Sequence, residues 1–282
     1  MVELKLNVSE APDVRVVLPN RAENVAIIRQ ALTGIADAMR LENGLLSDIK
    51  TAVSEACNNV VLHAYAGREG PLEVYVCPGE DELDVVVRDE GQGIKPNPPE
   101  PDAGVQGVGL SLIQALTHHV EFRGASGEGT EVRMGFRASG LVEPTPAANE
   151  AEDQVDPPTG DLVLSVTAGA LAAPVLGRVT AMLAARASFS VDRLADVVLV
   201  SDAIAAHAPT EIVGRHIHMG VDTTVGALDV RVGPLEPGGG RRLVTASALG
   251  GMPAVLDQLA NDVDVAVDGH SEQLHLRLTD AH

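Results

Sequence analysis

The chain has 282 residues, of which 45% are hydrophobic and 2% aromatic, and its 40 acidic residues outnumber 20 basic ones. A net charge of −20 leaves no basic surplus for a phosphate backbone, so we expect no direct nucleic-acid binding. The apolar content is too high for a disordered chain. The sequence contains no run of 18 apolar residues, so we expect no membrane-spanning helix. The start has no signal-peptide layout, and the two cysteines, Cys57 and Cys77, are typical of reduced intracellular thiols. We therefore expect a cytoplasmic protein without a membrane partner.

An acidic, proline-rich stretch divides the chain near its midpoint. Residues 141–161 read LVEPTPAANEAEDQVDPPTGD and contain neither Lys nor Arg. Fixed proline φ angles and repulsion between like charges predict a semi-extended linker here. We expect a first domain over residues 1–140, this linker over 141–161, and a second domain over 162–282.

The first half predicts two helices followed by mixed elements. An apolar strand at 14–18 precedes helices at about 21–39 and 43–65, in which apolar residues recur every three or four positions. Alternating strands at 72–77 and 83–87 follow, then a helix near 108–117 and strands at 120–124 and 130–136. This order predicts an α+β fold, a two-layer α/β sandwich with a mixed, mostly antiparallel sheet and helices on one face.

The second half weakly repeats this order. We expect a strand at 162–166, helices at 172–187 and 191–208, and strands in HIHMGVDTT and ALDVRVGP. A further strand and helix are expected within 243–259, and VDVAVDG and LHLRLTD predict the last strands. Glycines 238–240 predict a turn, because no helical pattern starts directly there. We interpret the chain as a tandem of two copies of one fold.

Candidate site residues first occur on the second predicted helix. Glu55 and Asn59 are four residues apart and therefore share a helix face. An amide oxygen can ligate a hard cation such as Mg²⁺, and a carboxylate can accept a hydroxyl proton. Taken alone, a polar stripe at a helix edge is the more frequent explanation of such a pair.

Three glycine-containing segments follow in the first half. Asp89 ends a predicted strand, and Gly91 and Gly93 follow within four residues. The carboxylate of Asp89 could bind an exocyclic amine, and the glycines would let the backbone approach the planar ring of a ligand. Gly104, Gly107 and Gly109 precede or open a helix, where amides and the helix dipole favour phosphate. Thr130 follows a Gly-Glu-Gly turn and begins the last strand. Each segment alone could be an ordinary turn.

Together, the four segments resemble the N, G1, G2 and G3 boxes of the GHKL ATPases, whose fold is the Bergerat α/β sandwich. IKTAVSEACNNVVLHAY, VVVRDEGQGI and GVGLSLI are most similar to the anti-sigma-factor serine kinases of bacteria. The resemblance covers roughly residues 12–137. It implies ATP and Mg²⁺ as cofactors, and a sigma factor and an anti-sigma antagonist protein as partners.

The same resemblance implies a role for each matching residue. Asn59 is expected to ligate Mg²⁺, Glu55 to act as the general base, and Asp89 to bind the adenine amine. The pocket-forming glycines would be Gly91, Gly93, Gly107 and Gly109, and Thr130 would support the adenine end. Arg29, on the first helix, falls where the family has an arginine at its partner-binding surface; by itself it could be a solvated charge.

Two departures from the family pattern leave more than one function open. The loop between Gly93 and Gly107 is short and proline-rich with Lys95 as its only base, and Gln106 stands where an arginine is frequent. Fewer cations weaken the case for phosphoryl transfer more than the case for nucleotide binding. The alternatives are a nucleotide-dependent binding switch without turnover and an orphan histidine-kinase-type ATPase domain.

The second half lacks the acid–amide pair. Two registers are open: Glu55 and Asn59 correspond either to Asp202 and Ala206 or to Ala203 and His207. Its strand ALDVRVGP also ends without a counterpart of Asp89. We therefore expect a degenerate copy without nucleotide, and a pseudo-dimeric monomer whose halves contact through like surfaces.

Overall fold

The computed structural model describes residues 12–79, 81–93, 106–124, 127, 129–138, 156–248 and 253–280. The elements of the first half are β1 (Val14–Pro19), a 3₁₀ turn (Ala22–Asn24), α1 (Val25–Met39), α2 (Asn43–Asn59), a π-helical turn (Val60–Ala64), β2 (Pro71–Pro78), β3 (Glu82–Asp89), α3 (Gln106–Leu116), β4 (His119–Gly124) and β5 (Thr130–Arg137). The predicted helix 43–65 is therefore regular only to Asn59 and widens in its last turn.

The second half follows a similar order. Its elements are β6 (Leu162–Thr167), α4 (Ala172–Arg186), α5 (Val191–His207), a 3₁₀ turn (Ala208–Thr210), β7 (His216–Thr224), β8 (Ala227–Leu235), α6 (Gly239–Ala246), α7 (Val255–Leu259), β9 (Asp262–Asp268) and β10 (Ser271–Thr279).

Two predictions for residues 238–259 are wrong. A helix, α6, does begin directly in the glycine run, at Gly239, and the expected strand is absent from the described part of this segment. The reason is helical spacing: Gly240, Leu243, Val244 and Ser247 are buried, whereas Arg241 and Arg242 are exposed. Burial every three or four residues stabilises a helix rather than a strand.

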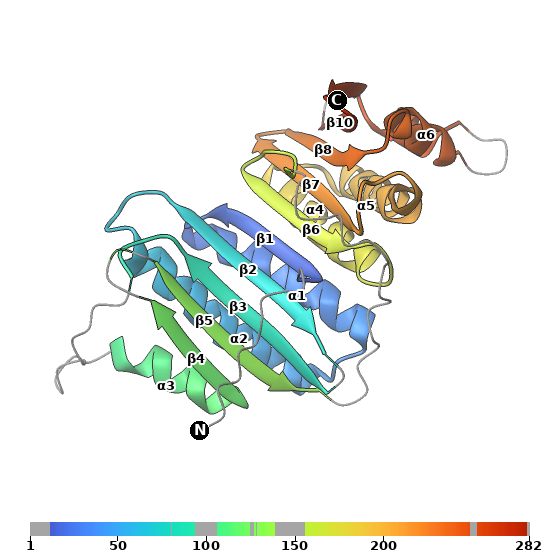
Figure 1. Cartoon of the computed structure of the whole chain (residues 1–282). Helices are drawn as coiled ribbons and strands as arrows, with labels where there is room; N and C mark the ends of the chain where they lie inside the picture. The colour runs from blue at the N-terminus through green and yellow to red at the C-terminus, as the bar shows by residue number, and fades with distance from the viewer. Residues whose placement is uncertain are drawn as a thin grey trace.

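The described strands form one ten-stranded sheet with the order β4-β5-β3-β2-β1-β6-β7-β8-β10-β9. The described ladders are antiparallel. At the centre, β1 of the first half pairs with β6 of the second, with Val14 opposite Val166 and Val16 opposite Leu164. The two halves are thus joined edge to edge into one continuous sheet (Figure 1).

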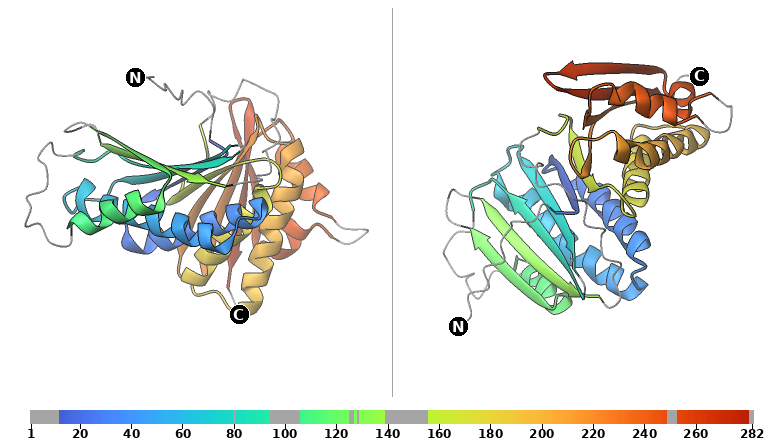
Figure 2. Two further views of the ribbon diagram at one scale, coloured as in Figure 1. Left: turned by 90° about the horizontal axis from the view of Figure 1, so that it is seen from below. Right: turned by 45° about the vertical axis from the view of Figure 1, so that its right-hand side comes forward.

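The helices pack on one face of this sheet (Figure 2). In β1, Val14, Val16 and Leu18 are buried toward the helices, whereas Arg15 alternates to the open face. A single cluster of buried apolar side chains includes residues of both halves. Helices α1 and α4 are packed against each other beneath the β1–β6 pair, so the seam has two layers.

The strands and the longer helices of the two halves occur in a similar order, although α7 has no counterpart in the described first half. The strand order on one side of the seam mirrors the order on the other. The corresponding positions are 148 residues apart at three separate places: the starts of β1 and β6 (Val14, Leu162), the starts of α2 and α5 (Asn43, Val191), and the left-handed residues after α1 and α4 (Arg40, Ser188). This correspondence supports the tandem interpretation. The domain limits stay predictions, and residues 141–155 of the expected linker lie outside the described residues.

A bilayer crossing needs a helix of about 20 mostly apolar residues. Among the described residues, no helix meets this requirement of length and apolar character.

Candidate nucleotide-binding site

Asp89 ends β3 and is buried, with 3% of its surface exposed. Its Oδ1 accepts a hydrogen bond of 2.8 Å from the Gly91 amide. Thr130, opposite it on β5, donates to the carboxylate from both its amide and its hydroxyl. Burial raises the pKa of Asp89, and the hydrogen bonds from Gly91 and Thr130 partly oppose this effect. The carboxylate is therefore fixed in position at the strand end.

The loop after β3 contacts the π-helical turn after α2. A Cβ added to Gly91 would lie 2.2 Å from the carbonyl oxygen of Ala64, and Gln92 donates to the same oxygen at 2.8 Å. On the other side, a Cβ at Gly129 would lie 2.0 Å from the Asp89 carbonyl oxygen. Neither glycine can be replaced without moving backbone. Gly93 has φ +70°, a left-handed conformation that glycine adopts without strain.

Tyr65 anchors this loop and was not among the predicted site residues. Its hydroxyl accepts a hydrogen bond of 2.8 Å from the Glu90 amide and donates to the Pro71 carbonyl oxygen. The side chain is buried, and burial raises the pKa of its hydroxyl. The backbone beside Asp89 is thus tied to the end of the helix that carries Glu55. A tyrosine at a predicted helix end gives no sequence signal for this role.

Glu55 and Asn59 lie four residues apart on α2, with Asn59 directly before the π-helical turn. Both side chains are half-buried, and within the described part of the chain neither makes a hydrogen bond or ion pair. π-Helical turns are frequent at functional sites. The amide and carboxylate oxygens of this pair are hard donors that fit Mg²⁺.

The start of α3 lies beside Glu55. A Cβ at Gly109 would be 3.0 Å from Glu55 Oε2, so this glycine lets the helix approach the carboxylate. Gly107 is in the first turn of α3. Gly104 and the predicted lid, including Lys95, lie outside the described residues. The structure therefore gathers Glu55, Asp89, Gly91, Gly109 and Thr130 through contacts between consecutive segments.

Arg29 does not belong to this group of residues. It is exposed on α1, and its guanidinium donates to Ser54 Oγ at 3.3 Å. Lys50 lies nearby: burial lowers its pKa first, and the charges of Arg29 and Arg178 lower it further. Arg178 comes from α4 and hydrogen-bonds Asp37 of α1. These three bases, Arg29, Lys50 and Arg178, form a basic patch on the helical layer across the seam.

In the second half, the pattern of buried residues on α5 shows which of the two possible alignments with α2 applies. The buried residues of α2 (Ile49, Ala52, Val53, Ala56, Cys57) and of α5 (Val197, Val200, Ser201, Ile204, Ala205) are related by the same 148-residue spacing. Glu55 therefore corresponds to Ala203, and Asn59 to His207. The end of β8 is the fully buried Leu235, where β3 ends in Asp89.

The glycine loop of the second half is occupied by a carboxylate of the same chain. Glu272 of β10 accepts hydrogen bonds from the amides of Gly238, at 2.8 Å, and Gly240, at 3.0 Å. These amides lower the pKa of Glu272. A side chain thus uses the donors that a phosphate would need at the start of α6.

A second group of possible metal ligands lies on the open face of the sheet. Glu82, Asp84 and His119 place ligand atoms within 4.8 Å of one another, and His119 Nδ1 is 2.9 Å from Glu82 Oε1. Arg133 is close enough that its charge lowers the pKa of Asp84, although burial raises that pKa more. A neighbouring guanidinium opposes cation binding, and this group is on the face of β3 opposite to Asp89.

Comparisons with known proteins agree with this geometry. A family model described as "Histidine kinase-like ATPase domain" matches residues 18–136. The serine-protein kinase RsbW of Bacillus pumilus (strain SAFR-032) is 35% identical over 125 residues, covering 39% of this chain and 77% of the relative. RsbW of Bacillus subtilis (strain 168) is 33% identical over 132 residues, covering 42% and 82%.

Among solved structures, the histidine kinase domain of the Erythrobacter litoralis EL346 blue-light activated histidine kinase is 27% identical, covering 33% of this chain and 44% of that one. Its TM-score of 0.28 is too low to support a structural conclusion. The assignment depends instead on the family match over residues 18–136, which contain the candidate site, and on the identity to the RsbW relatives. The chain belongs to the family of histidine kinase-like (GHKL) ATPase-domain proteins that includes the RsbW serine-protein kinases.

Proposed function

We propose that this protein is a cytoplasmic anti-sigma regulator that binds one ATP–Mg²⁺ in its first half. In this function it sequesters an RNA polymerase sigma factor and phosphorylates a serine of an anti-sigma antagonist protein. The observation that carries the proposal is the buried Asp89, fixed by Gly91 and Thr130 next to a helix that presents Glu55 and Asn59. The RsbW relatives support the choice of reaction.

Each residue of the site has a role in this proposal. The Asp89 carboxylate accepts a hydrogen bond from the adenine amine, which gives selectivity for adenine over bases without an amine there. Asn59 Oδ1 holds the metal, and Mg²⁺ supplies the charge that balances the phosphates. Glu55 would accept the proton of the attacking serine hydroxyl as the serine oxygen bonds to the γ-phosphorus of ATP, with ADP as the leaving group. Gly107, in the first turn of α3, would offer its backbone amide to phosphate, and Gly109 lets the helix lie close to Glu55.

The basic patch of Arg29, Lys50 and Arg178 is the proposed partner-binding surface. Asp37 pairs with Arg178 within this patch, and the patch still has more bases than acids in a chain with twice as many acids as bases. Arg29 and Lys50 belong to the first half and Arg178 to the second, so both halves contribute. Basic side chains around a helical surface favour an acidic partner segment and speed its association.

The second half is proposed to be a degenerate copy that replaces a partner subunit. The pairing of like elements supports this: β1 with β6 and α1 with α4. Glu272 in the glycine loop and Leu235 at the strand end support the absence of a second nucleotide site. The protein would then be a pseudo-dimeric monomer with a single catalytic half.

A second candidate function is a nucleotide-dependent binding switch without turnover. The specific observation in its favour is the sequence of residues 94–106, where Lys95 is the only base and Gln106 precedes the second glycine box. Transfer of the γ-phosphoryl group depends on cationic stabilisation more than binding does.

Calorimetric titration with ATP–Mg²⁺ tests the nucleotide site. The expected stoichiometry is one per chain, with weaker binding of ATP–Mg²⁺ in Asn59→Ala. Asn58→Ala is the matched control, because Asn58 is the adjacent amide on α2 and was not assigned to the site. Unchanged affinity in Asn59→Ala would remove Asn59 from the metal site.

Co-purification from the native cell, with mass spectrometry, identifies the sigma factor and the antagonist. Transfer of ³²P from ATP to the recovered antagonist then separates the kinase from the switch. No transfer, with nucleotide-dependent retention of the partner, would favour the switch.

A further inference from the structure

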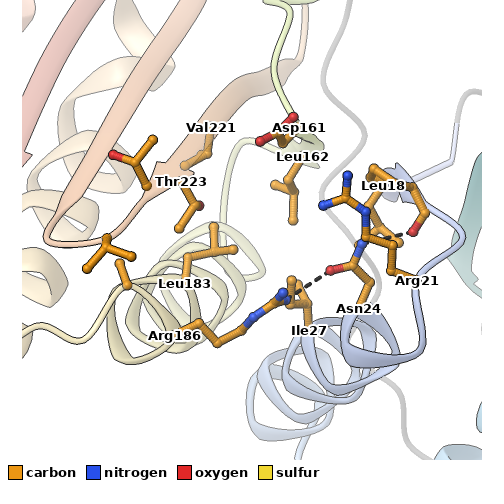
Figure 3. A pocket seen from close by; sticks show the side chains of 14 residues that line it. Leu18, Arg21, Asn24, Ile27, Asp161, Leu162, Leu183, Arg186, Val221 and Thr223 are labelled. Atoms are coloured by element: carbon orange, nitrogen blue, oxygen red, sulfur yellow. Dashed lines mark hydrogen bonds between the residues drawn. The ribbon is translucent and has the colours of Figure 1, made fainter. Parts of the chain in front are cut away.

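A cavity of about 310 Å³ lies between the two halves, at one end of the β1–β6 seam (Figure 3). The first half contributes the end of β1 and the beginning of α1, and the second half contributes the ends of α4 and β7 with the start of β6. Its size is within the range of small-molecule sites, about 300–1,000 Å³. None of the candidate nucleotide-binding residues lines it.

One part of the wall is apolar. The lining side chains include Leu18, Ile27, Leu162 and Leu183, which come from both halves and are each at least 96% buried. These side chains can cover a short aliphatic group, and burial of such a group would be favourable by about 0.8 kcal/mol per methylene.

Arg186 gives the cavity a cation without a carboxylate partner. Its guanidinium donates to Asn24 Oδ1 at 2.9 Å, as Figure 3 shows, and within the described residues it makes no ion pair. Asn24 is 6% exposed and is itself fixed, because its Nδ2 donates to the Pro19 carbonyl oxygen at 2.8 Å. The rest of the Arg186 fork therefore has donors for a further acceptor. Arg186 is exposed, so these donors are accessible to a ligand from solution.

The other two charged residues that line the cavity, Arg21 and Asp161, differ from Arg186 in their partners. Arg21 is already paired with Glu69, at 2.9 Å from its Nε and 2.8 Å from a terminal nitrogen. Asp161 lies on the Arg21 side, and its charge acts on that guanidinium. Arg21 is therefore neutralised by nearby acids, which leaves Arg186 as the group that can bind an anion.

We propose that this inter-half cavity binds a small amphipathic anion, a carboxylate or phosphate monoester with a short aliphatic tail. The head group would accept hydrogen bonds from Arg186, whose planar fork matches both kinds of head group. The tail would lie against the apolar wall formed by Leu18, Ile27, Leu162 and Leu183. Because the walls come from both halves, the ligand stabilises the closed β1–β6 seam and the native state with it.

Thermal unfolding of the full chain tests this site with hexanoate, hexyl phosphate and hexylamine as probes. We expect the melting temperature to rise saturably with at least one of the two anions, and not with the amine, whose tail is the same. The anion that binds more tightly identifies the head group. Saturable stabilisation by hexylamine, or no saturable effect of either anion, would overturn the proposal.

Two variants with a matched control locate the binding group. Arg186→Gln should weaken anion binding about tenfold or more, since it removes a charge-assisted hydrogen bond. Arg137→Gln is the control, because Arg137 is also an exposed arginine without an ion pair among the described residues, but it lies at the end of β5 and does not line the cavity. Equal weakening in both variants, or none in Arg186→Gln, would contradict the assignment.

Asp161→Asn is a second variant, for which stronger rather than weaker anion binding is expected. This test does not require the Arg186→Gln variant to be stable. Removing a negative charge from the cavity wall should strengthen anion binding, whereas a purely structural effect would not. Weaker binding in this variant would also overturn the proposal. Persistence of anion binding in Asp89→Asn, which is expected to lose ATP, distinguishes this cavity from the nucleotide site.

Discussion

Asp89 combines burial with three hydrogen bonds, so its role can be separated from its contribution to stability. Burial raises the pKa of Asp89, which means that keeping its charge costs folding free energy at neutral pH. Asp89→Asn removes this cost but keeps only one acceptor oxygen for the donors of Gly91 and Thr130, so we expect the two effects to oppose each other and the unfolding temperature to change little. The variant should lose ATP binding, because the new amide would present a donor to the adenine amine. Calorimetry and thermal unfolding measure the two effects.

Asp84→Asn is the control for this prediction. Asp84 lies on the same strand, and burial also raises its pKa, but it faces the opposite side of the sheet beside Arg133. It should keep ATP binding. If Asp84→Asn lost ATP binding and Asp89→Asn kept it, the nucleotide site would lie on the face of the sheet opposite to the one proposed here.

The raised pKa of Asp89 also predicts the direction of a pH effect. The folded protein binds this proton more tightly than the unfolded chain, so this group favours folding as the pH falls through its raised pKa. ATP binding should change the opposite way, because the protonated carboxyl accepts hydrogen bonds poorly. We expect affinity to decrease on acidification at a pH above the ordinary aspartate value of about 3.9. An affinity that is constant down to that value would contradict the assignment.

Glu55 is expected to act in chemistry more than in affinity. As a general base it acts in the transition state, so Glu55→Gln should reduce phosphoryl transfer by about 100- to 10,000-fold while leaving the Kd for ATP almost unchanged. Glu42→Gln is a matched control, because Glu42 precedes the same helix, is exposed and makes no capping hydrogen bond. Full transfer by Glu55→Gln would assign the base to another group.

At the residue scale, the sequence predicted the candidate site residues better than the residues that hold them in place. Asp89, Gly91 and Thr130 were predicted from box motifs, and the structure brings them together. Tyr65 was missed because its role depends on hydrogen bonds to two backbone groups, those of Glu90 and Pro71, and Glu90 is 25 residues away along the chain. A spacing pattern contains no such information.

At the scale of elements, the glycine loop at the start of α6 is bound by a carboxylate of the same chain. The Gly238 and Gly240 amides hydrogen-bond Glu272, so Glu272→Gln should weaken the start of α6. A neutral amide retains only one acceptor oxygen for the two donors. Hydrogen exchange should become faster over residues 238–246, and ATP stoichiometry should stay at one per chain.

Glu236→Gln is the control, since Glu236 is an exposed acid just before the same glycines. Lowering the pH should have the same effect on hydrogen exchange over residues 238–246 as Glu272→Gln. The lowered pKa of Glu272 means that its stabilising effect is complete above the unfolded value and is lost as the pH falls through the lower folded value. Unchanged exchange in Glu272→Gln would show that α6 does not depend on this carboxylate.

The same element explains why the glycine run was wrongly predicted to be a turn. The run of three glycines indicated a turn because glycine has a low helix propensity, about 1 kcal/mol below alanine. Here the amides are held by Glu272, and burial of Leu243 and Val244 stabilises the helix. The longer helices α1, α2, α4 and α5 were predicted well, because each has a sustained apolar face of four turns or more.

At the scale of the whole molecule, the sequence suggested two separate domains and the structure joins them in one sheet. The weak repeat predicted that the two halves contact each other through similar surfaces. The sequence of an edge strand does not show which strand it pairs with, so the β1–β6 pairing could not be predicted. Burial at a constant spacing of 148 residues shows how closely the two helical layers match. The seam then depends on a contact that is not repeated, between Gly34 of α1 and the start of α4.

Gly34 and Gly177 give a matched test of that contact. A Cβ at Gly34 would lie 2.6 Å from the carbonyl oxygen of Pro174, so Gly34→Ala must push α1 and α4 apart. A Cβ at Gly177 on α4 would have its nearest neighbours at 3.9 Å and would fit. We expect Gly34→Ala to lower the free energy of unfolding by about 1–3 kcal/mol. Gly177→Ala should raise it by about 0.5–1 kcal/mol through helix propensity alone.

Denaturant unfolding of the full chain, followed by circular dichroism, measures both changes. Because both halves share one sheet and one apolar cluster, loosening the seam should affect them together, and Gly34→Ala should shift the midpoint of unfolding of both halves. Separate transitions for the two halves in Gly34→Ala would show that the seam carries most of their coupling. If Gly34→Ala were as stable as Gly177→Ala, α1 and α4 would not be in close contact at this position, and the partner surface that spans them would lose its structural basis.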